Sequence, residues 1–144
     1  MTDDILKLEN QLCFPLYAAA KEVVSRYKPF LDEIDLTYTQ YITMMVLWEH
    51  KKTGVKELGE YLYLDSGTLT PLLKRLEAKG LLRRQRSAED ERQVNIVITE
   101  NGEKLKDKAL EIPLKMSSCI SLTQEDAKVL YTLLYKLLGQ FNHQ

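Results

Sequence analysis

The segment from Tyr63 to Leu76 places the strongest constraint on how this chain can fold. Four of its leucines recur at positions i, i+3, i+4 and i+7, which puts them on one face of an α-helix: Leu69, Leu72, Leu73 and Leu76. The opposite face is small and hydroxylated at its start and basic further along. Asp65 or Ser66 can cap the N-terminus of this helix. A helix whose first turns are small can bring its backbone close to a partner, as is typical of a helix that enters the major groove of DNA.

Two neighbouring patterns give this helix a context. The segment 55–62 carries a short apolar stripe of its own and predicts a second helix, joined to the first by a few residues. Downstream, Gly80 is expected to end the long helix, and segments 82–86 and 94–98 are expected to form a β-hairpin. The order helix, helix, hairpin predicts a winged helix-turn-helix with residues 87–92 at the tip of the wing.

Positive charge gathers in the same region. Basic residues outnumber acidic ones between Lys74 and Arg92, although the whole chain has a net charge of −1. Ordinary α+β domains also contain amphipathic helices followed by hairpins, but the helix order and the charge together favour binding to double-stranded DNA. The residues expected to contact DNA are Ser66, Gly67, Thr68, Thr70, Pro71, Lys74, Arg75, Arg86, Asp90 and Arg92.

These contacts are expected to divide into three kinds. Thr68, Thr70 and Pro71 should face bases or the adjacent backbone. Lys74 and Arg75 should lie against phosphates. Arg92 should enter the minor groove, where Asp90 orients it.

The N-terminal part is predicted to form one long helix over residues 4–27, because its apolar residues keep helical spacing. Around Cys13 this helix is apolar on almost every side. A surface helix of a monomer would not tolerate that, so we expect a subunit interface here. Pro15 should bend the helix near Cys13, because it lacks the N–H that would bond to the Gln11 carbonyl.

The remaining helices follow from caps and apolar spacing. Residues 28–31 are expected to make a turn or a short helix, and Thr37 or Thr39 to start the next helix. The side chains expected to pack inward from that helix are Tyr41, Met44, Met45 and Trp48. After the wing, Thr99 should cap a helix that continues to Cys119 with a kink at Pro113, and Thr123 should cap the last helix.

The last helix carries apolar residues over about half of its circumference, by the step of about 100° per residue. One core cannot use so wide a face, so this helix and the N-terminal one are expected to form a homodimer interface. The predicted fold is therefore mostly α with a small β-hairpin wing, in a single chain of 144 residues. Residues 36–99 would form the winged helix-turn-helix, and residues 1–35 and 100–144 the dimerisation helices.

Composition narrows the class of protein. No apolar run approaches membrane-spanning length, and the start of the chain, residues 1–4, is acidic where a signal peptide would be basic, so we expect a cytoplasmic protein. There are two cysteines, Cys13 and Cys119, and no C-x-x-C motif. A zinc site, a cofactor and a fold stapled by disulfides are therefore not expected.

Over its whole length the chain resembles the MarR family of bacterial repressors, and within it the organic-hydroperoxide-sensing OhrR branch. Four stretches carry the resemblance: residues 7–14, 36–41, 63–71 and 89–92. The first and third are specific to that branch, and the fourth is shared across the wider family. The resemblance implies a dimer that represses transcription until an oxidant attacks Cys13.

The resemblance also assigns roles around this cysteine. It implies that the hydroxyls of Tyr27 and Tyr38, from the partner subunit, hold the Cys13 thiolate, and that Tyr17 lies nearby. Some members of the branch close a disulfide across the dimer with a second cysteine late in the chain, which makes Cys119 a second redox candidate. The effector implied is an organic hydroperoxide or a low-molecular-weight thiol.

The chemistry of cysteine and tyrosine is consistent with a sensing role for Cys13, and it leaves the alternative of a core cysteine open. The thiolate is the form of cysteine that attacks a peroxide, and tyrosine hydroxyls can donate hydrogen bonds to it. Apolar walls would favour a hydroperoxide with an apolar tail. Cys13 and Cys119 could instead be small core residues.

Three other functions stay open at this point. A regulator that responds to a small aromatic ligand would share the fold and would not need Cys13. A purely structural DNA-binding dimer would need neither the cysteine nor the tyrosines. A thiol-dependent enzyme should bring an Arg or Thr beside the thiol and strands before its helices, and the sequence has neither, so an enzyme is not expected.

Overall fold

The computed structural model describes residues 3–141; Met1 and Thr2, which begin the acidic start, and residues 142–144 lie outside the described part. Two short 3-10 helices, Asp3–Leu6 and Leu8–Asn10, precede the main elements. The elements are α1 (Cys13–Asp32), α2 (Tyr38–His50), β1 (Lys52–Gly54), α3 (Val55–Leu62), α4 (Ser66–Ala78), β2 (Leu82–Arg86), β3 (Val94–Ile98), α5 (Glu100–Ala109), α6 (Ile112–Ser117) and α7 (Gln124–Leu138).

Helix α4 forms as its leucine spacing predicts. Leu69, Leu72, Leu73 and Leu76 are all buried, against a core that includes Leu58 of α3, Met44 and Leu47 of α2 and Ile96 of β3. The cap is Asp65 rather than Ser66, since the backbone N–H of Thr68 donates to Asp65 Oδ1 at 2.7 Å. This hydrogen bond holds the pKa of the Asp65 carboxyl below its usual range. The helix-turn-helix is therefore confirmed.

The wing is confirmed, together with a strand that the sequence did not reveal. Gly80 ends α4 with a φ of 78°, a left-handed conformation that favours glycine. Strands β2 and β3 pair antiparallel, and the three-residue strand β1 adds to the other edge of β3, which gives the order β1-β3-β2. Three residues are too few to show an alternating pattern, so β1 had no signal in the sequence.

The prediction of one helix over residues 4–27 is wrong at both ends. Helix α1 begins at Cys13 and continues to Asp32, through the segment expected to make a turn. The predicted bend at Pro15 also fails: Pro15 lies in the first turn of α1, where no N–H has a partner within the helix. Pro29 is the proline inside this helix, and the helix continues past it.

Two further expectations need correction. Thr37 starts α2 through a capping box with Gln40, as one of the two candidates, but Met45 is 44% exposed and does not pack inward. The helix expected to run from Thr99 to Cys119 is broken into α5 and α6, with a proline in the first turn of α6, and Cys119 follows the end of α6. Thr123 caps α7 as predicted, by accepting from the backbone N–H of Asp126 at 3.0 Å.

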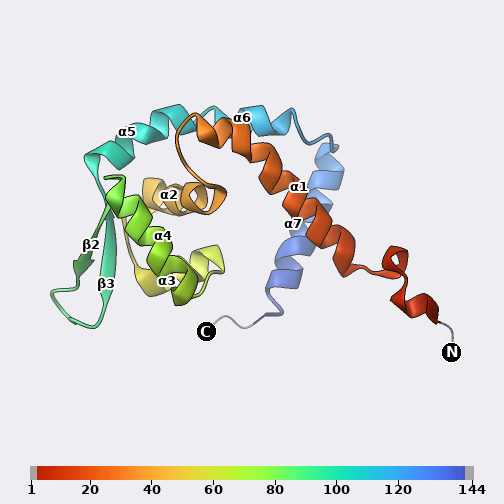
Figure 1. The fold of residues 1–144 in the computed structure, drawn as a ribbon, viewed down its shortest axis with the longest axis horizontal. Coiled ribbons are helices and arrows are strands. Elements are labelled where there is room, and N and C mark those ends of the chain that lie inside the picture. The colour runs from red at the N-terminus through yellow and green to blue at the C-terminus, as the bar shows by residue number, and fades with distance from the viewer. Residues whose placement is uncertain (1–2, 142–144) are drawn as a thin grey trace.

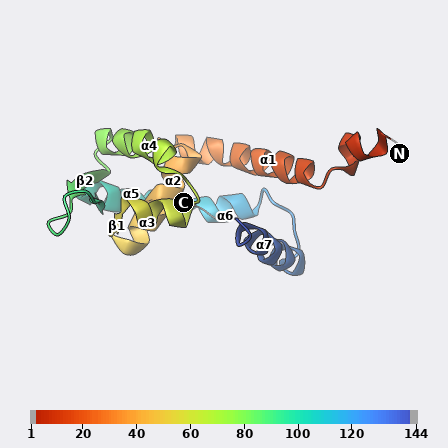
Figure 2. The same cartoon turned by 90° about the horizontal axis from the view of Figure 1, so that it is seen from below.

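Two helices reach away from this core. In Figure 1 the winged region lies at the left, while the N-terminal end of α1 and all of α7 lie at the right, and Figure 2 shows the same separation from below. No residue of α7 is buried. Exposed apolar side chains on α1 and α7 include Phe14, Leu16, Val129, Leu130 and Leu133. No helix in residues 3–141 is long and apolar enough to span a bilayer.

Gly102 should be essential for stability. A Cβ built there would overlap the carbonyl oxygen of Leu81 and lie 2.8 Å from Cγ1 of Ile98, and the carbonyl of Gly102 accepts a buried hydrogen bond of 2.8 Å from Trp48 Nε1. Gly102→Ala should therefore lower the free energy of unfolding by about 3 kcal/mol, the upper part of the usual range for overpacking.

Urea denaturation at fixed protein concentration measures this loss. Gly67→Ala is the matched control, because the nearest atom to its added Cβ lies 3.5 Å away. Equal unfolding midpoints for the two variants would contradict the packing described here.

Candidate nucleic-acid interface and thiol site

The exposed face of α4 carries the residues that the sequence singled out for DNA. Ser66, Gly67, Thr68, Thr70 and Pro71 are all exposed in the first half of the helix, and Lys74 and Arg75 are exposed further along. The Thr70 hydroxyl donates to the Ser66 carbonyl at 2.9 Å, which leaves its lone pairs free to accept. The face therefore begins with hydroxyl and backbone groups and becomes positively charged.

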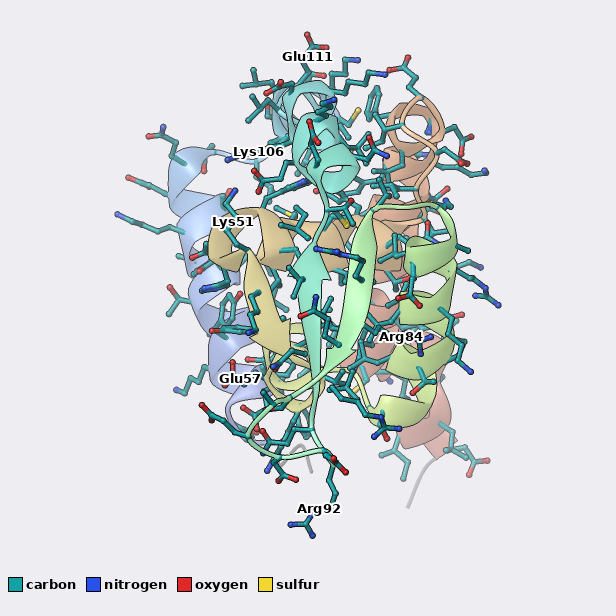
Figure 3. The ribbon with its side chains drawn as sticks, turned by 90° about the vertical axis from the view of Figure 1, so that its left-hand side faces the viewer. Lys51, Glu57, Arg84, Arg92, Lys106 and Glu111 are labelled. Carbon is teal, nitrogen blue, oxygen red and sulfur yellow. The ribbon has the colours of Figure 1, made fainter. Side chains whose placement is uncertain are left out.

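The wing presents one arginine far into solvent. The side chain of Arg92 is 92% exposed, and Figure 3 shows it projecting beyond the tip of the wing. Its Nε lies 3.4 Å from Asp90 Oδ1, and its backbone N–H donates to the same oxygen at 3.0 Å. The predicted contact between Asp90 and Arg92 is thus present. Arg86 donates from Nη1 to the carbonyl of Glu91 at 2.7 Å, which ties the base of the wing to its tip.

The first turn of α4 and the wing border one open hollow of about 900 Å³. Ser66 and Thr70 line it from α4, and Arg84, Arg92 and Asn95 line it from the wing. Because they line a common hollow, the helix and the wing can meet the same partner on one side of the molecule.

The basic residues of this region divide into two groups. Lys79 donates to the Asp35 carbonyl and, at 3.1 Å, to Gln40 Oε1, while Arg84 pairs with Glu77. These two cations hold the fold together. Within residues 3–141, Lys74, Arg75 and Arg83 make no ion pair. Positive charge is therefore free on the exposed face of α4 and at the start of β2.

Cys13 occupies the first position of α1 and is exposed. Within a single chain, Cys13 is therefore not a buried core residue, which was the alternative interpretation of this cysteine. Tyr17 is one helical turn further on, 64% exposed, and therefore lies on the same face as Cys13. Phe14 and Leu16 are exposed beside them, so the thiol sits in an apolar surface.

Tyr27 and Tyr38 lie together at the other end of α1. Their ring centroids are 4.9 Å apart, and Tyr41 completes a cluster at 5.8 Å from Tyr27. Burial raises the pKa of all three tyrosines, so their hydroxyls stay protonated and able to donate at neutral pH. Neither hydroxyl of Tyr27 or Tyr38 has a hydrogen-bond partner within the described chain.

A single chain cannot bring these tyrosines to its own Cys13. Both Cys13 and Tyr27 belong to the continuous helix α1. Fourteen residues separate them, about 21 Å at 1.5 Å per residue. Tyr38 lies beside Tyr27, with its ring tilted by 60° to that of Tyr27, and so belongs to the same distant end of the helix.

Cys119 is also exposed, and its thiol lies 3.6 Å from the Lys115 carbonyl. Lys115 Nζ in turn lies 3.3 Å from Glu33 Oε2 and 5.6 Å from the Phe30 ring centroid, at the C-terminal end of α1. From Phe30 to Cys13 the helix spans about 25 Å. Both cysteines are free thiols, and Cys119 is not the core residue that its apolar neighbours suggested.

The structural roles of two residues in this region were not predicted from the sequence. Tyr41 was expected only as a core residue, although it belongs to the tyrosine cluster. Glu77 was counted only as a negative charge, although it holds Arg84. Their partners are contributed by other elements, so no local pattern could have revealed them. No group of His, Cys, Asp and Glu in residues 3–141 could hold a metal ion.

A helix-turn-helix with an exposed polar and basic face and an extended wing defines a winged-helix protein of the DNA-binding class. Comparison with known proteins identifies the family. Residues 25–109 match the family described as Transcriptional regulator SarA/Rot, and the chain belongs to this family of transcriptional regulators.

The chain is 53% identical over 135 residues to the organic hydroperoxide resistance transcriptional regulator of Bacillus subtilis, covering 94% of this chain and 92% of that protein. This confirms the resemblance to the organic-hydroperoxide branch of the MarR family.

Solved structures agree. Overoxidized AbfR bound to DNA, a Staphylococcus epidermidis protein, is 35% identical with a TM-score of 0.79, covering 98% of this chain and all of that one. Disulfide-formed AbfR, 34% identical, has a TM-score of 0.67, covering 94% and 96%. The fold expected from the sequence is therefore confirmed, and these relatives are regulators rather than enzymes.

Proposed function

We propose that this protein is a homodimeric repressor in the cytoplasm that binds a double-stranded DNA operator and releases it when an organic hydroperoxide oxidises Cys13. The observation that carries the proposal is an exposed thiol in an apolar surface, with tyrosine donors that only a second copy of the chain can bring to it. The similarity to a hydroperoxide resistance regulator supports the same chemistry.

The dimer supports both halves of this function. Apolar side chains on α1 and α7 that water surrounds in one chain would be buried against the same helices of the partner. Burial there brings Tyr27 and Tyr38 of one protomer within reach of Cys13 of the other. It also fixes the spacing between two α4 helices, which must match half-sites about 34–36 Å apart.

Each reading element has a separate task on the operator. The small first turns of α4 let Thr68, Thr70 and Pro71 approach base edges in the major groove. Lys74 and Arg75 neutralise phosphates, and Arg92, held by Asp90, enters the minor groove. Arg86 supports the wing through Glu91.

The chemical step begins with the Cys13 thiolate. It attacks the outer oxygen of the hydroperoxide and the O–O bond breaks, so that Cys13 becomes a sulfenic acid and the alkoxide that leaves takes a proton from water to become an alcohol. A thiol then displaces water from the sulfenic acid to form a disulfide. That thiol is either a low-molecular-weight thiol or Cys119 of the partner.

Oxidation would change the interface that sets the half-site spacing. It removes the anion that the two tyrosine hydroxyls hold and adds a polar group to an apolar surface. The packing of α1 must rearrange, which rotates the two winged regions relative to each other. A hundredfold loss of operator affinity needs about 2.7 kcal/mol, within reach of one disrupted buried network.

Arg92→Ala should weaken operator binding by about 1–3 kcal/mol, because it removes the side chain that extends furthest from the wing. A titration of labelled operator at fixed salt measures the change. Glu91→Ala is the control from the same tip: Glu91 contributes its carbonyl to Arg86, which the substitution keeps. Unchanged affinity for Arg92→Ala would remove the wing from the proposed contact.

Cys13→Ser should bind the operator as the native protein does and should ignore an organic hydroperoxide. Wild-type protein given one equivalent of hydroperoxide should lose affinity about a hundredfold. If Cys119 resolves the sulfenic acid, the oxidised protein runs as a covalent dimer on a non-reducing gel and Cys119→Ser abolishes that band. Release of DNA by treated Cys13→Ser would place the sensor elsewhere and favour a ligand-responsive regulator.

A further inference from the structure

Glu77, near the end of α4, makes a three-point contact with Arg84 in the middle of β2. Its Oε2 accepts from the backbone N–H of Arg84 at 3.0 Å, and its Oε1 accepts from Nε at 3.0 Å and lies 2.9 Å from Nη2. Figure 3 shows Arg84 where β2 borders α4. Both carboxylate oxygens and the backbone of the strand take part, so the contact ties whole elements together rather than two mobile side chains.

The surroundings make this contact rigid. Leu76, the neighbour of Glu77, is fully buried, and Arg84 pairs in the sheet with Ile96, which is also fully buried. The side chains of Glu77 and Arg84 are each 34% exposed. Hydrogen bonds from Arg84 hold the pKa of the Glu77 carboxyl below its usual range, so Glu77 stays ionised near neutral pH.

This arrangement gives Arg84 a different task from that of the free cations beside it. A guanidinium whose Nε and Nη2 are already directed at a carboxylate has its side-on fork occupied, so that edge cannot also hold a phosphate. Lys74 has no such partner within the described chain. Arg84 therefore belongs to the frame of the DNA-binding region, although it lines the same hollow as Arg92.

We propose that Glu77 is a positioning residue which, through Arg84, fixes the angle between α4 and the wing, so that Arg92 reaches the minor groove while α4 lies in the major groove. The inference rests on the proposed DNA-binding function and adds to it a residue that contacts no DNA. In this proposal the negatively charged Glu77 favours DNA binding, although it lies close to the negatively charged DNA.

The sign of one substitution separates this role from simple electrostatics. Glu77→Gln removes a negative charge near DNA, so electrostatics alone predicts tighter operator binding. Positioning predicts binding about tenfold weaker, with footprint protection lost at the base pairs under the wing and kept under α4. Glu89→Gln removes the same charge from the wing tip, where the Glu89 side chain has no partner in the described chain, and should not weaken binding.

Salt dependence separates positioning from phosphate contact. Arg84→Ala should weaken binding while leaving the slope of log affinity against log salt concentration unchanged. Lys74→Ala should lower that slope by about one. Arg84→Lys keeps the charge and loses the fork, so it should weaken binding as Arg84→Ala does. If thermal denaturation shows that Glu77→Gln is not folded, Arg84→Lys replaces it as the test of positioning.

Two results would overturn the proposal: a Glu77→Gln protein that binds the operator as tightly as the wild type or more tightly, or an Arg84→Ala protein with a reduced salt slope. A failure of DNA binding as such is distinguishable. A wild-type protein that gives no footprint, or Lys74→Ala and Arg92→Ala variants that both keep the wild-type affinity and footprint, would contradict the proposed DNA-binding surface itself.

Discussion

Helices α1 and α7 carry apolar side chains that the single chain leaves in water, and α7 buries none of its residues. Burying apolar area is worth about 25 cal/mol per Å², and the exposed apolar faces of these helices gain that stabilisation only against a second copy. The other functional features depend on this association. The Cys13 thiol lies at one end of α1 and the tyrosines proposed as its donors lie near the other, and two α4 helices gain a fixed spacing only when two chains are joined.

The same association explains how a small chemical change can have a large effect. A winged region is stiff within itself: the leucines of α4 are buried, and Glu77 joins α4 to β2 through Arg84. The interface formed by α1 and α7 joins the two stiff regions, and it is also where Cys13 would be oxidised. In the proposed mechanism, a change of packing at the thiol moves each reading surface as a body, and the strict spacing of half-sites turns this movement into lost affinity.

The sequence predicted most of the parts whose causes are local. The leucine spacing of α4, a cap at Asp65 or Ser66, the turn at Gly80 and the contact between Asp90 and Arg92 all involve residues near one another in the chain, and the structure selects Asp65 as the cap. It failed where the start of a helix was misplaced and where a helix continued through a proline: Pro15 was expected to bend a helix that in fact begins two residues before it, and α1 continues through Pro29. Partners from distant elements, such as those of Glu77 and Tyr41, left no local signal.

The central claim is that the sensing site is shared between two chains, and a mixed dimer tests it directly. One chain carries Cys13→Ser with intact tyrosines, and the other carries Tyr27→Phe and Tyr38→Phe with intact Cys13. The rate at which an alkylating reagent modifies the remaining Cys13 is measured at neutral pH. If the donors come from the partner, this thiol should react at the wild-type rate, and it should react slowly when all three substitutions lie on one chain opposite a wild-type chain. The reverse order of rates would contradict the shared site.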